Sequence, residues 1–260
     1  MIGLIQAQFS ENTKKLWFYV SLVLFLNSLI STTQLSWDYY LERYSFWDIV
    51  LNVTNNPIDI LYIFTLISTL VIINPLIGDS WSQNVCVRSG TRRKYFASIL
   101  ITHGMKTALF VLMIPFTCYA LSLFYPVSFQ DDWGLITAAG VVLTHRPLDL
   151  VALSILLLFL RFFCLGLAAK IVVIATKRHS FGVITYLLLS FGIDAGYGTS
   201  NALSGRLLML SNTLVSVYHH GEWYGVNTRF ALIYWLVLIV VLIAIGYVVI
   251  RKMDLSSRGV

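Results

Sequence analysis

The chain has 260 residues, of which 58% are hydrophobic and only 12% are charged. An ordinary soluble domain carries about 25% charged residues, and a chain of this size has too much surface to hide so many apolar side chains in one core. This composition excludes a soluble enzyme, a secreted disulfide scaffold and a disordered regulator, and it leaves an integral membrane protein. The formal net charge of +6 therefore indicates the anionic inner face of a bilayer as a partner, and not nucleic acid.

Six apolar stretches are candidates for membrane-spanning helices, since about 20 helical residues cover the apolar core of a bilayer. The fifth stretch is the shortest and contains Asp194. Pro115 predicts a kink in the third, whereas Pro57 and Pro147 stand near helix starts, where proline is tolerated. We therefore expect an all-α polytopic membrane protein in which residues 1–260 form a single transmembrane domain. The six predicted spans are about 16–35, 58–77, 95–124, 148–174, 181–197 and 230–250.

Three segments outside the spans have patterns of their own. Ile2, Ile5 and Phe9 recur at helical spacing among polar residues, which predicts a helix on the membrane surface. The segment Ser36–Asn56 is rich in aromatic residues, and this composition is typical of the interface between water and lipid. The segment Leu203–Val217 is apolar but too short to cross, so we expect it to re-enter the outer leaflet before the last span.

The distribution of charge predicts the orientation. With the N-terminus inside, twelve of the 18 Lys and Arg residues fall on inner segments and four on outer ones, as the positive-inside rule requires. Most acidic residues, including Asp48 and Asp59, fall on the outer connections. The sequence thus predicts that both termini are cytoplasmic. The other two cations, Lys106 and Arg161, lie within spans.

Lys106, Arg161 and Asp194 are the ionisable residues that matter most, because each comes to lie in the middle third of a span. Exposing one of them to lipid costs at least about 2.5–3.5 kcal/mol, so we expect all three to face protein or water, with Asp194 paired to a cation. His103 precedes Lys106 by one turn and shares its face. The pattern fits either a polar lining for a substrate or a buried ion pair that fixes helix register.

Glycines flank Asp194 on the fifth span. Gly192 and Gly196 have the spacing that lets two helices approach closely, and the neighbouring helix can belong to a second subunit.

The connection between the second and third spans, Gly78–Lys94, has the pattern of a short capped helix. Asp79 or Ser80 can cap its start and Gly90 can end it in a left-handed conformation. The chain contains no Gly-x-x-x-x-Gly-Lys-Ser/Thr loop, so we do not expect it to hydrolyse ATP by that route.

Taken together, these features resemble the type-2 family of ATP-binding-cassette (ABC) export permeases. The run Val87–Phe96 is similar to the basic Ser-Gly-x-Arg stretch that leads into the third span of that family. The resemblance implies that Asp79–Ser89 is a coupling helix that docks on a separate ATPase subunit, and that ATP and Mg bind to that subunit with no cofactor on this chain. It also implies a second copy of the permease, or a paralogue, as partner. The coupling residues that the resemblance implies are Asp79, Ser80, Trp81 and Gln83, together with Arg88, Arg92 and Arg93, which it places near the ATPase or the lipid headgroups.

The expected function is therefore a non-enzymatic permease subunit of an ATP-driven exporter, multi-pass in a bacterial plasma membrane. In the expected mechanism, ATP binding on the partner moves the coupling helix, and the first, second and fifth spans re-pack. Two alternatives stay open. One is an ion- or proton-coupled secondary transporter or channel that uses Asp194, Arg161 and Lys106 as a relay. The other is an immunity or sensor protein that binds a toxin or peptide at its aromatic outer surface.

Overall fold

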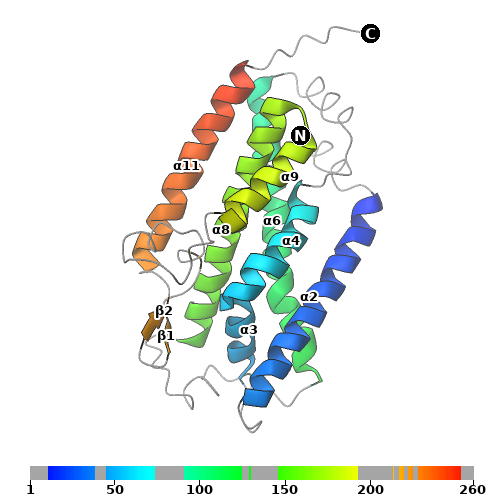
Figure 1. Cartoon of the computed structure of the whole chain (residues 1–260), viewed down its shortest axis with the longest axis vertical. Helices are drawn as coiled ribbons and strands as arrows, with labels where there is room; N and C mark the ends of the chain where they lie inside the picture. Colours follow the sequence, from blue (N-terminus) through cyan, green and yellow to red (C-terminus); the bar gives the residue numbers. More distant parts are fainter. Residues whose placement is uncertain are drawn as a thin grey trace.

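The structure is a computed structural model that describes residues 11–38, 45–73, 91–124, 129, 146–192, 213, 217–219, 222–224 and 228–252. Within these residues the chain is almost entirely helical (Figure 1). In the described part of the chain, four helices are long and apolar enough to cross a membrane, and they coincide with the first, third, fourth and sixth predicted spans. They are α2 (Glu11–Asp38), α6 (Arg92–Ser122), α8 (Pro147–Thr176) and α11 (Thr228–Lys252).

The second predicted span is part of a bent unit. Helix α3 (Phe46–Asn55) meets the following segment at an angle of 65°, and the two together are long and apolar enough for one broken span. That segment, residues 59–73, consists of the π-helix η1 (Asp59–Phe64), a turn of α-helix α4 (Thr65–Ser68) and the π-helix η2 (Thr69–Ile73).

Helix α3 lies in the aromatic segment assigned to the water–lipid interface, and that assignment stays a prediction. Most of the helix is buried against protein, with Ile49, Val50 and Val53 at most 1% exposed. Its start is fixed by a capping box: the Ser45 hydroxyl accepts from the Trp47 N–H, and Asp48 Oδ2 accepts from the Ser45 N–H at 3.0 Å. The helix packs on α8 and α6.

The fifth predicted span is a shorter apolar unit, in which α9 (His179–Leu187) continues into the π-helix η3 (Leu188–Gly192). A two-stranded antiparallel hairpin, β1 (Val217–His219) and β2 (Glu222–Tyr224), precedes α11. The predicted surface helix at 2–9 and the coupling segment at 79–89 lie outside the described residues. So does the predicted re-entrant segment, apart from Thr213 and Val217.

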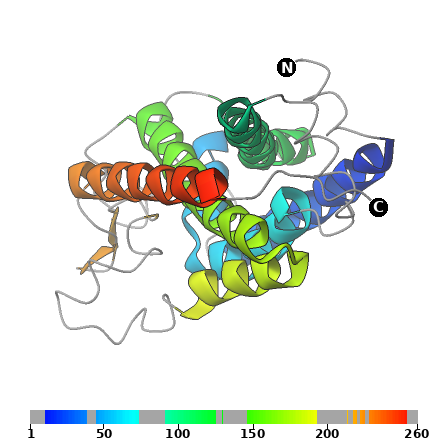
Figure 2. The same cartoon turned by 90° about the horizontal axis from the view of Figure 1, so that it is seen from above.

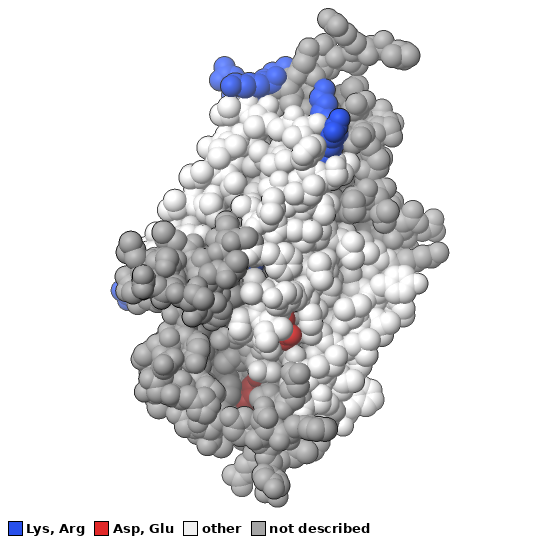
Figure 3. Space-filling view, viewed as in Figure 1, with Lys and Arg blue, Asp and Glu red and all other residues white. Residues whose placement is uncertain are grey.

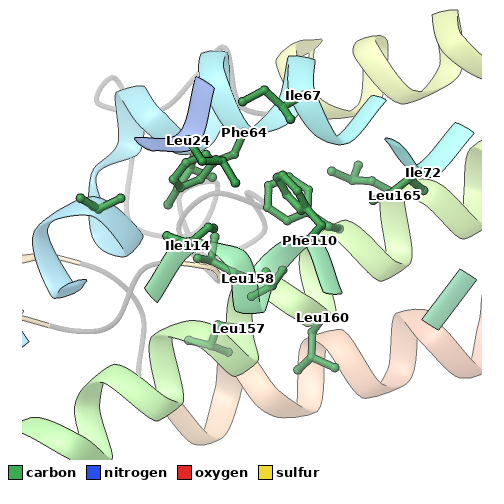
Figure 4. Close-up of a cluster of buried hydrophobic side chains, with 14 of the residues drawn as sticks. Leu24, Phe64, Ile67, Ile72, Phe110, Ile114, Leu157, Leu158, Leu160 and Leu165 are labelled. Atoms are coloured by element: carbon green, nitrogen blue, oxygen red, sulfur yellow. The ribbon is translucent and has the colours of Figure 1, made fainter. Parts of the chain in front are cut away.

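Helix α8 is the centre of the bundle. It packs against α3, α6, α9 and α11, and the view from above shows it between α6, α9 and α11, with α2 at the edge (Figure 2). Of its apolar stretch 67% is buried, against 17% for α11, so α11 presents most of its apolar surface outward. The side chains of the main hydrophobic core come from α2, η1, α6 and α8, among other elements (Figure 4). There the Phe110 ring packs edge-on against both Phe64 and Phe162.

The turn between α8 and α9 is tight. Lys177 adopts the left-handed conformation with φ of 56°, and its N–H donates to the Val173 carbonyl at 2.8 Å. Gly182 then brings α9 close to α8, because a Cβ at this position would lie 2.3 Å from Val173 Cγ2 and 3.1 Å from the Ala169 carbonyl oxygen.

Basic residues gather at one end of the molecule, where α6 begins and where α8 and α11 end (Figure 3). The acidic side chains visible on the same face lie in the other half. This separation is the one expected if the basic end faces the cytoplasm. The described basic residues at that end are Arg92, Arg93, Lys94, Lys177, Arg178, Arg251 and Lys252.

Candidate functional site

Arg161 lies halfway along α8 with its side chain fully buried. Its Nη2 donates to Ser190 Oγ on η3 at 3.1 Å. The expectation that this cation faces protein is therefore confirmed.

Four buried hydroxyls beside Arg161 join the second and fifth predicted spans. Ser190 Oγ lies 2.8 Å from Thr65 Oγ1, and Ser68 Oγ lies 2.5 Å from the Tyr186 hydroxyl. All four side chains have no exposed surface. We call Arg161, Thr65, Ser68, Tyr186 and Ser190 the Arg161 cluster.

The three π-helical segments meet at this cluster. Thr65 and Ser68 form the ends of the single α-helical turn between η1 and η2, and Ser190 is in η3. A π-turn widens the helix and displaces its carbonyls from the usual i→i−4 pattern, and such turns occur frequently at functional sites. Here Thr65 Oγ1 donates to the Ile60 carbonyl five residues back, at 2.9 Å, and Ser68 Oγ donates to the Thr65 carbonyl at 3.0 Å. Both hydroxyls thus have a second partner within their own segment.

A second buried polar site contains Asp59, at the start of η1. Its carboxylate oxygen Oδ2 accepts a hydrogen bond from Ser31 Oγ of α2 at 2.9 Å, and the side chain is 5% exposed. Asn27, one turn earlier on the same face of α2, is also buried. The charge distribution predicts that Asp59 lies on the outer side of the membrane, and this stays a prediction. In the structure Asp59 follows the bend after α3, and its carboxylate is turned toward α2.

His103 and Lys106 share a buried face of α6, as expected, and are 0% and 5% exposed. His103 Nε2 is hydrogen-bonded to the Phe163 carbonyl of α8 at 2.7 Å, and the two rings stack with centroids 4.8 Å apart. Gly166 leaves the space that the His103 ring fills.

Several predicted site residues lie outside the described part of the chain. These include Asp194, so its pairing with Lys106 or Arg161 stays a prediction, as does the close packing assigned to Gly192, whose backbone ends η3. The others outside are Asp79, Ser80, Trp81, Gln83, Arg88 and Gly196.

Arg92 and Arg93 are described, and both reach across to α11. Arg92 Nη1 donates to the Arg251 carbonyl oxygen, and Arg93 Nε donates to the Tyr247 hydroxyl at 3.3 Å. These contacts hold the start of α6 to the end of α11. Contact of either arginine with an ATPase stays a prediction.

The hydroxyl members of the Arg161 cluster were not predicted from the sequence. One signal for them was present: Thr65, Ser68 and Thr69 have the i, i+3, i+4 spacing of one helical face within an apolar run. Their partners Tyr186 and Ser190, more than a hundred residues later, come together with them only in the fold.

The Arg161 cluster supplies a fixed cation and exchangeable hydroxyls, which can orient a polar group or rearrange as helices move. Among the described residues no group of His, Cys, Asp and Glu side chains is placed to hold a metal ion. No protein-family model matches the sequence, and no curated protein or solved structure matches the chain.

Proposed function

We propose that the chain is the membrane-spanning permease subunit of an ATP-driven exporter of the ABC type. The observation that carries this proposal is the hydroxyl-bonded junction of residues 59–73 with residues 179–192 around Arg161. These are the second and fifth predicted spans, which the expected mechanism requires to re-pack.

The junction is suited to movement because its bonds are weak and replaceable. Hydrogen bonds between membrane helices average about 0.6 kcal/mol. Thr65 and Ser68 also have carbonyl partners within their own segment, so both hydroxyls stay hydrogen-bonded when the segments slide. Arg161 behaves differently, since moving it into lipid costs at least about 2.5–3.5 kcal/mol. It therefore stays inside the bundle while the hydroxyls change partners.

The proposed motor is a separate ATPase that binds ATP and Mg and docks on the coupling segment Asp79–Ser89. This part of the proposal rests on the family resemblance. The proposal also includes a second permease copy, outward transport and a bacterial plasma membrane. Its six-span topology with both termini inside rests on hydropathy and on the distribution of charge. The basic end of the bundle supports the cytoplasmic position of the start of α6, directly after that segment. ATP can drive the movement only if the coupling segment makes different contacts with the ATPase in its two states.

The test is to purify the tagged full-length chain from membranes of its own host in a mild detergent. We expect a polypeptide with Walker motifs to co-purify and the sample to hydrolyse ATP in a vanadate-sensitive way. The double substitution Trp81→Ala with Gln83→Ala is expected to remove most of this ATPase activity. The matched control, Trp223→Ala with Glu222→Ala on the hairpin, leaves it in place. A wild-type preparation without any such ATPase refutes the proposal.

One alternative, an ion-coupled secondary transporter or channel, is favoured by a specific observation: three ionisable side chains, Asp59, Lys106 and Arg161, are at most 5% exposed within the bundle. It predicts proton or ion flux into proteoliposomes under an imposed gradient and without nucleotide. That flux should be lost in Asp59→Asn and kept in Asp149→Asn, which changes a carboxylate at the first turn of α8.

A further inference from the structure

A cavity of about 470 Å³ opens between the first turn of α6 and the last turn of α11. It lies at the basic end of the molecule, at the level where the apolar stretches of both helices end. Its lining combines three arginines with apolar and hydroxyl-bearing side chains: Thr91, Arg92, Arg93, Tyr247, Ile250 and Arg251.

The arginines at the rim are held in place across the gap. Arg92 Nη1 donates to the Arg251 carbonyl oxygen, and Arg93 Nε donates to the Tyr247 hydroxyl at 3.3 Å. Each guanidinium has five N–H donors in a planar fork, so these contacts orient the two side chains and leave donors for a ligand. Arg251 adds a third cation from the other helix. Such a fork matches the oxygens of a phosphate group.

The floor of the cavity and the surface beside it are apolar. Ile250 is 2% exposed and packs with Tyr95 and Phe96 in a separate small core between α6 and α11. From this point toward the middle of the bundle, α11 exposes Val248, Ile245 and Val241. A ligand that fills the site therefore meets cations at the rim and hydrocarbon below them.

We infer that this cavity binds the headgroup of an anionic phospholipid of the inner leaflet. Its phosphate lies among Arg92, Arg93 and Arg251, and an acyl chain follows the exposed face of α11. Basic pockets between membrane helices on the cytoplasmic side bind headgroups of this kind. The apolar surface beside the cavity favours a lipid over a free phosphate, because a soluble anion would leave the exposed side chains of Val248, Ile245 and Val241 uncovered. The bound lipid joins the start of α6 to the end of α11. This inference needs the chain to be embedded in a membrane, but it does not need an ATPase partner.

The test measures thermal unfolding of the delipidated full-length chain in a non-ionic detergent. We expect phosphatidylglycerol in mixed micelles to raise Tm in a saturable way, and phosphatidylcholine or inorganic phosphate to leave it unchanged. In the double variant Arg92→Gln with Arg251→Gln, the concentration of phosphatidylglycerol needed for half the effect rises at least about tenfold. The matched control, Lys177→Gln with Arg178→Gln, removes two cations from the same end but outside the cavity. It should raise the half-effect concentration of phosphatidylglycerol less than about threefold.

Two outcomes overturn the inference. If both double variants lose the same affinity for phosphatidylglycerol, surface charge alone attracts the lipid. If inorganic phosphate raises Tm, the cavity is a site for a soluble anion. If the arginine variant fails to fold, a photoreactive phosphatidylglycerol on the wild-type chain decides the question. Labelling is expected at residues 91–93 and 247–251, and labelling only elsewhere refutes the site.

Discussion

The substitution Gly166→Ala tests how tightly α6 and α8 pack around His103. A Cβ at position 166 would lie 2.4 Å from His103 Cε1, 2.4 Å from Ile72 Cγ2 and 3.0 Å from His103 Nε2. Carbon atoms in contact are normally about 3.5–4.0 Å apart, so the new methyl group would overlap two side chains from two different segments. Neither side chain has room to move freely, because both are buried.

The expected cost combines three contributions. Inserting a methyl group into a packed core costs about 1–3 kcal/mol. Displacing the His103 ring also breaks its 2.7 Å hydrogen bond to the Phe163 carbonyl, which costs about 1 kcal/mol more. Alanine gains about 0.5–1 kcal/mol over glycine inside a helix. The free energy of unfolding should therefore fall by about 1–3.5 kcal/mol.

Gly104→Ala is the matched control on the facing helix. A Cβ there meets its nearest neighbour, Phe163 Cε2, at 3.6 Å, which is an ordinary contact, so this variant should be as stable as the wild type or more stable by up to about 1 kcal/mol. Both variants are compared by equilibrium unfolding of the purified chain in mixed micelles. If Gly166→Ala unfolds at the same midpoint as Gly104→Ala, the close approach of α6 and α8 is refuted. In a His103→Ala background the cost of Gly166→Ala should shrink, because one of the two clashing side chains is gone.

Three further predictions concern other parts of the bundle. Lys177→Gly should raise Tm, because a left-handed φ of 56° costs an L side chain about 1–2 kcal/mol; Lys177→Val should lower it, and the same Tm for both would contradict the turn. A double-mutant cycle of Thr65→Val and Ser190→Ala, read by unfolding, should give a coupling of about 0.6 kcal/mol; a value of zero would mean that the 2.8 Å contact contributes nothing. Ser31→Ala should destabilise the chain by about 1–3 kcal/mol because Asp59 loses a buried donor, whereas Ser31→Thr keeps the hydroxyl; equal stability of the two would argue against this bond.

Much of the helical architecture could be predicted from hydropathy alone. Four of the six predicted spans coincide with long apolar helices, because a run of about 20 apolar residues has few other stable states in a bilayer. The burial of Arg161 and Lys106 could also be predicted, because exposing either cation to lipid is costly.

Helix α3 was missed because its aromatic residues have the composition of an interface segment, and composition does not show where a chain packs. The sequence did contain a local signal, since Ser45 and Asp48 have the Ser-x-x-Asp spacing of a capping box. Recognising this spacing would have predicted a helix that starts at Phe46.

The Arg161 cluster could be predicted only in part. Serine and threonine are close to neutral in hydropathy, so they do not stand out within an apolar run. Thr65 and Ser190 come together only through the packing of two segments that are more than a hundred residues apart in the chain.

The contacts between hydroxyls also impose a waiting time during synthesis. Thr54, Thr65 and Ser68 find their partners Ser154, Ser190 and Tyr186 at sequence separations of 100, 125 and 118 residues. At about 5–20 residues per second, the earlier helices enter the membrane about 5–25 s before those partners are made. In the finished structure each of the three hydroxyls also donates to a carbonyl of its own segment. The same bonds keep these groups satisfied in lipid until the second half of the chain arrives, so the nascent protein can enter the bilayer helix by helix.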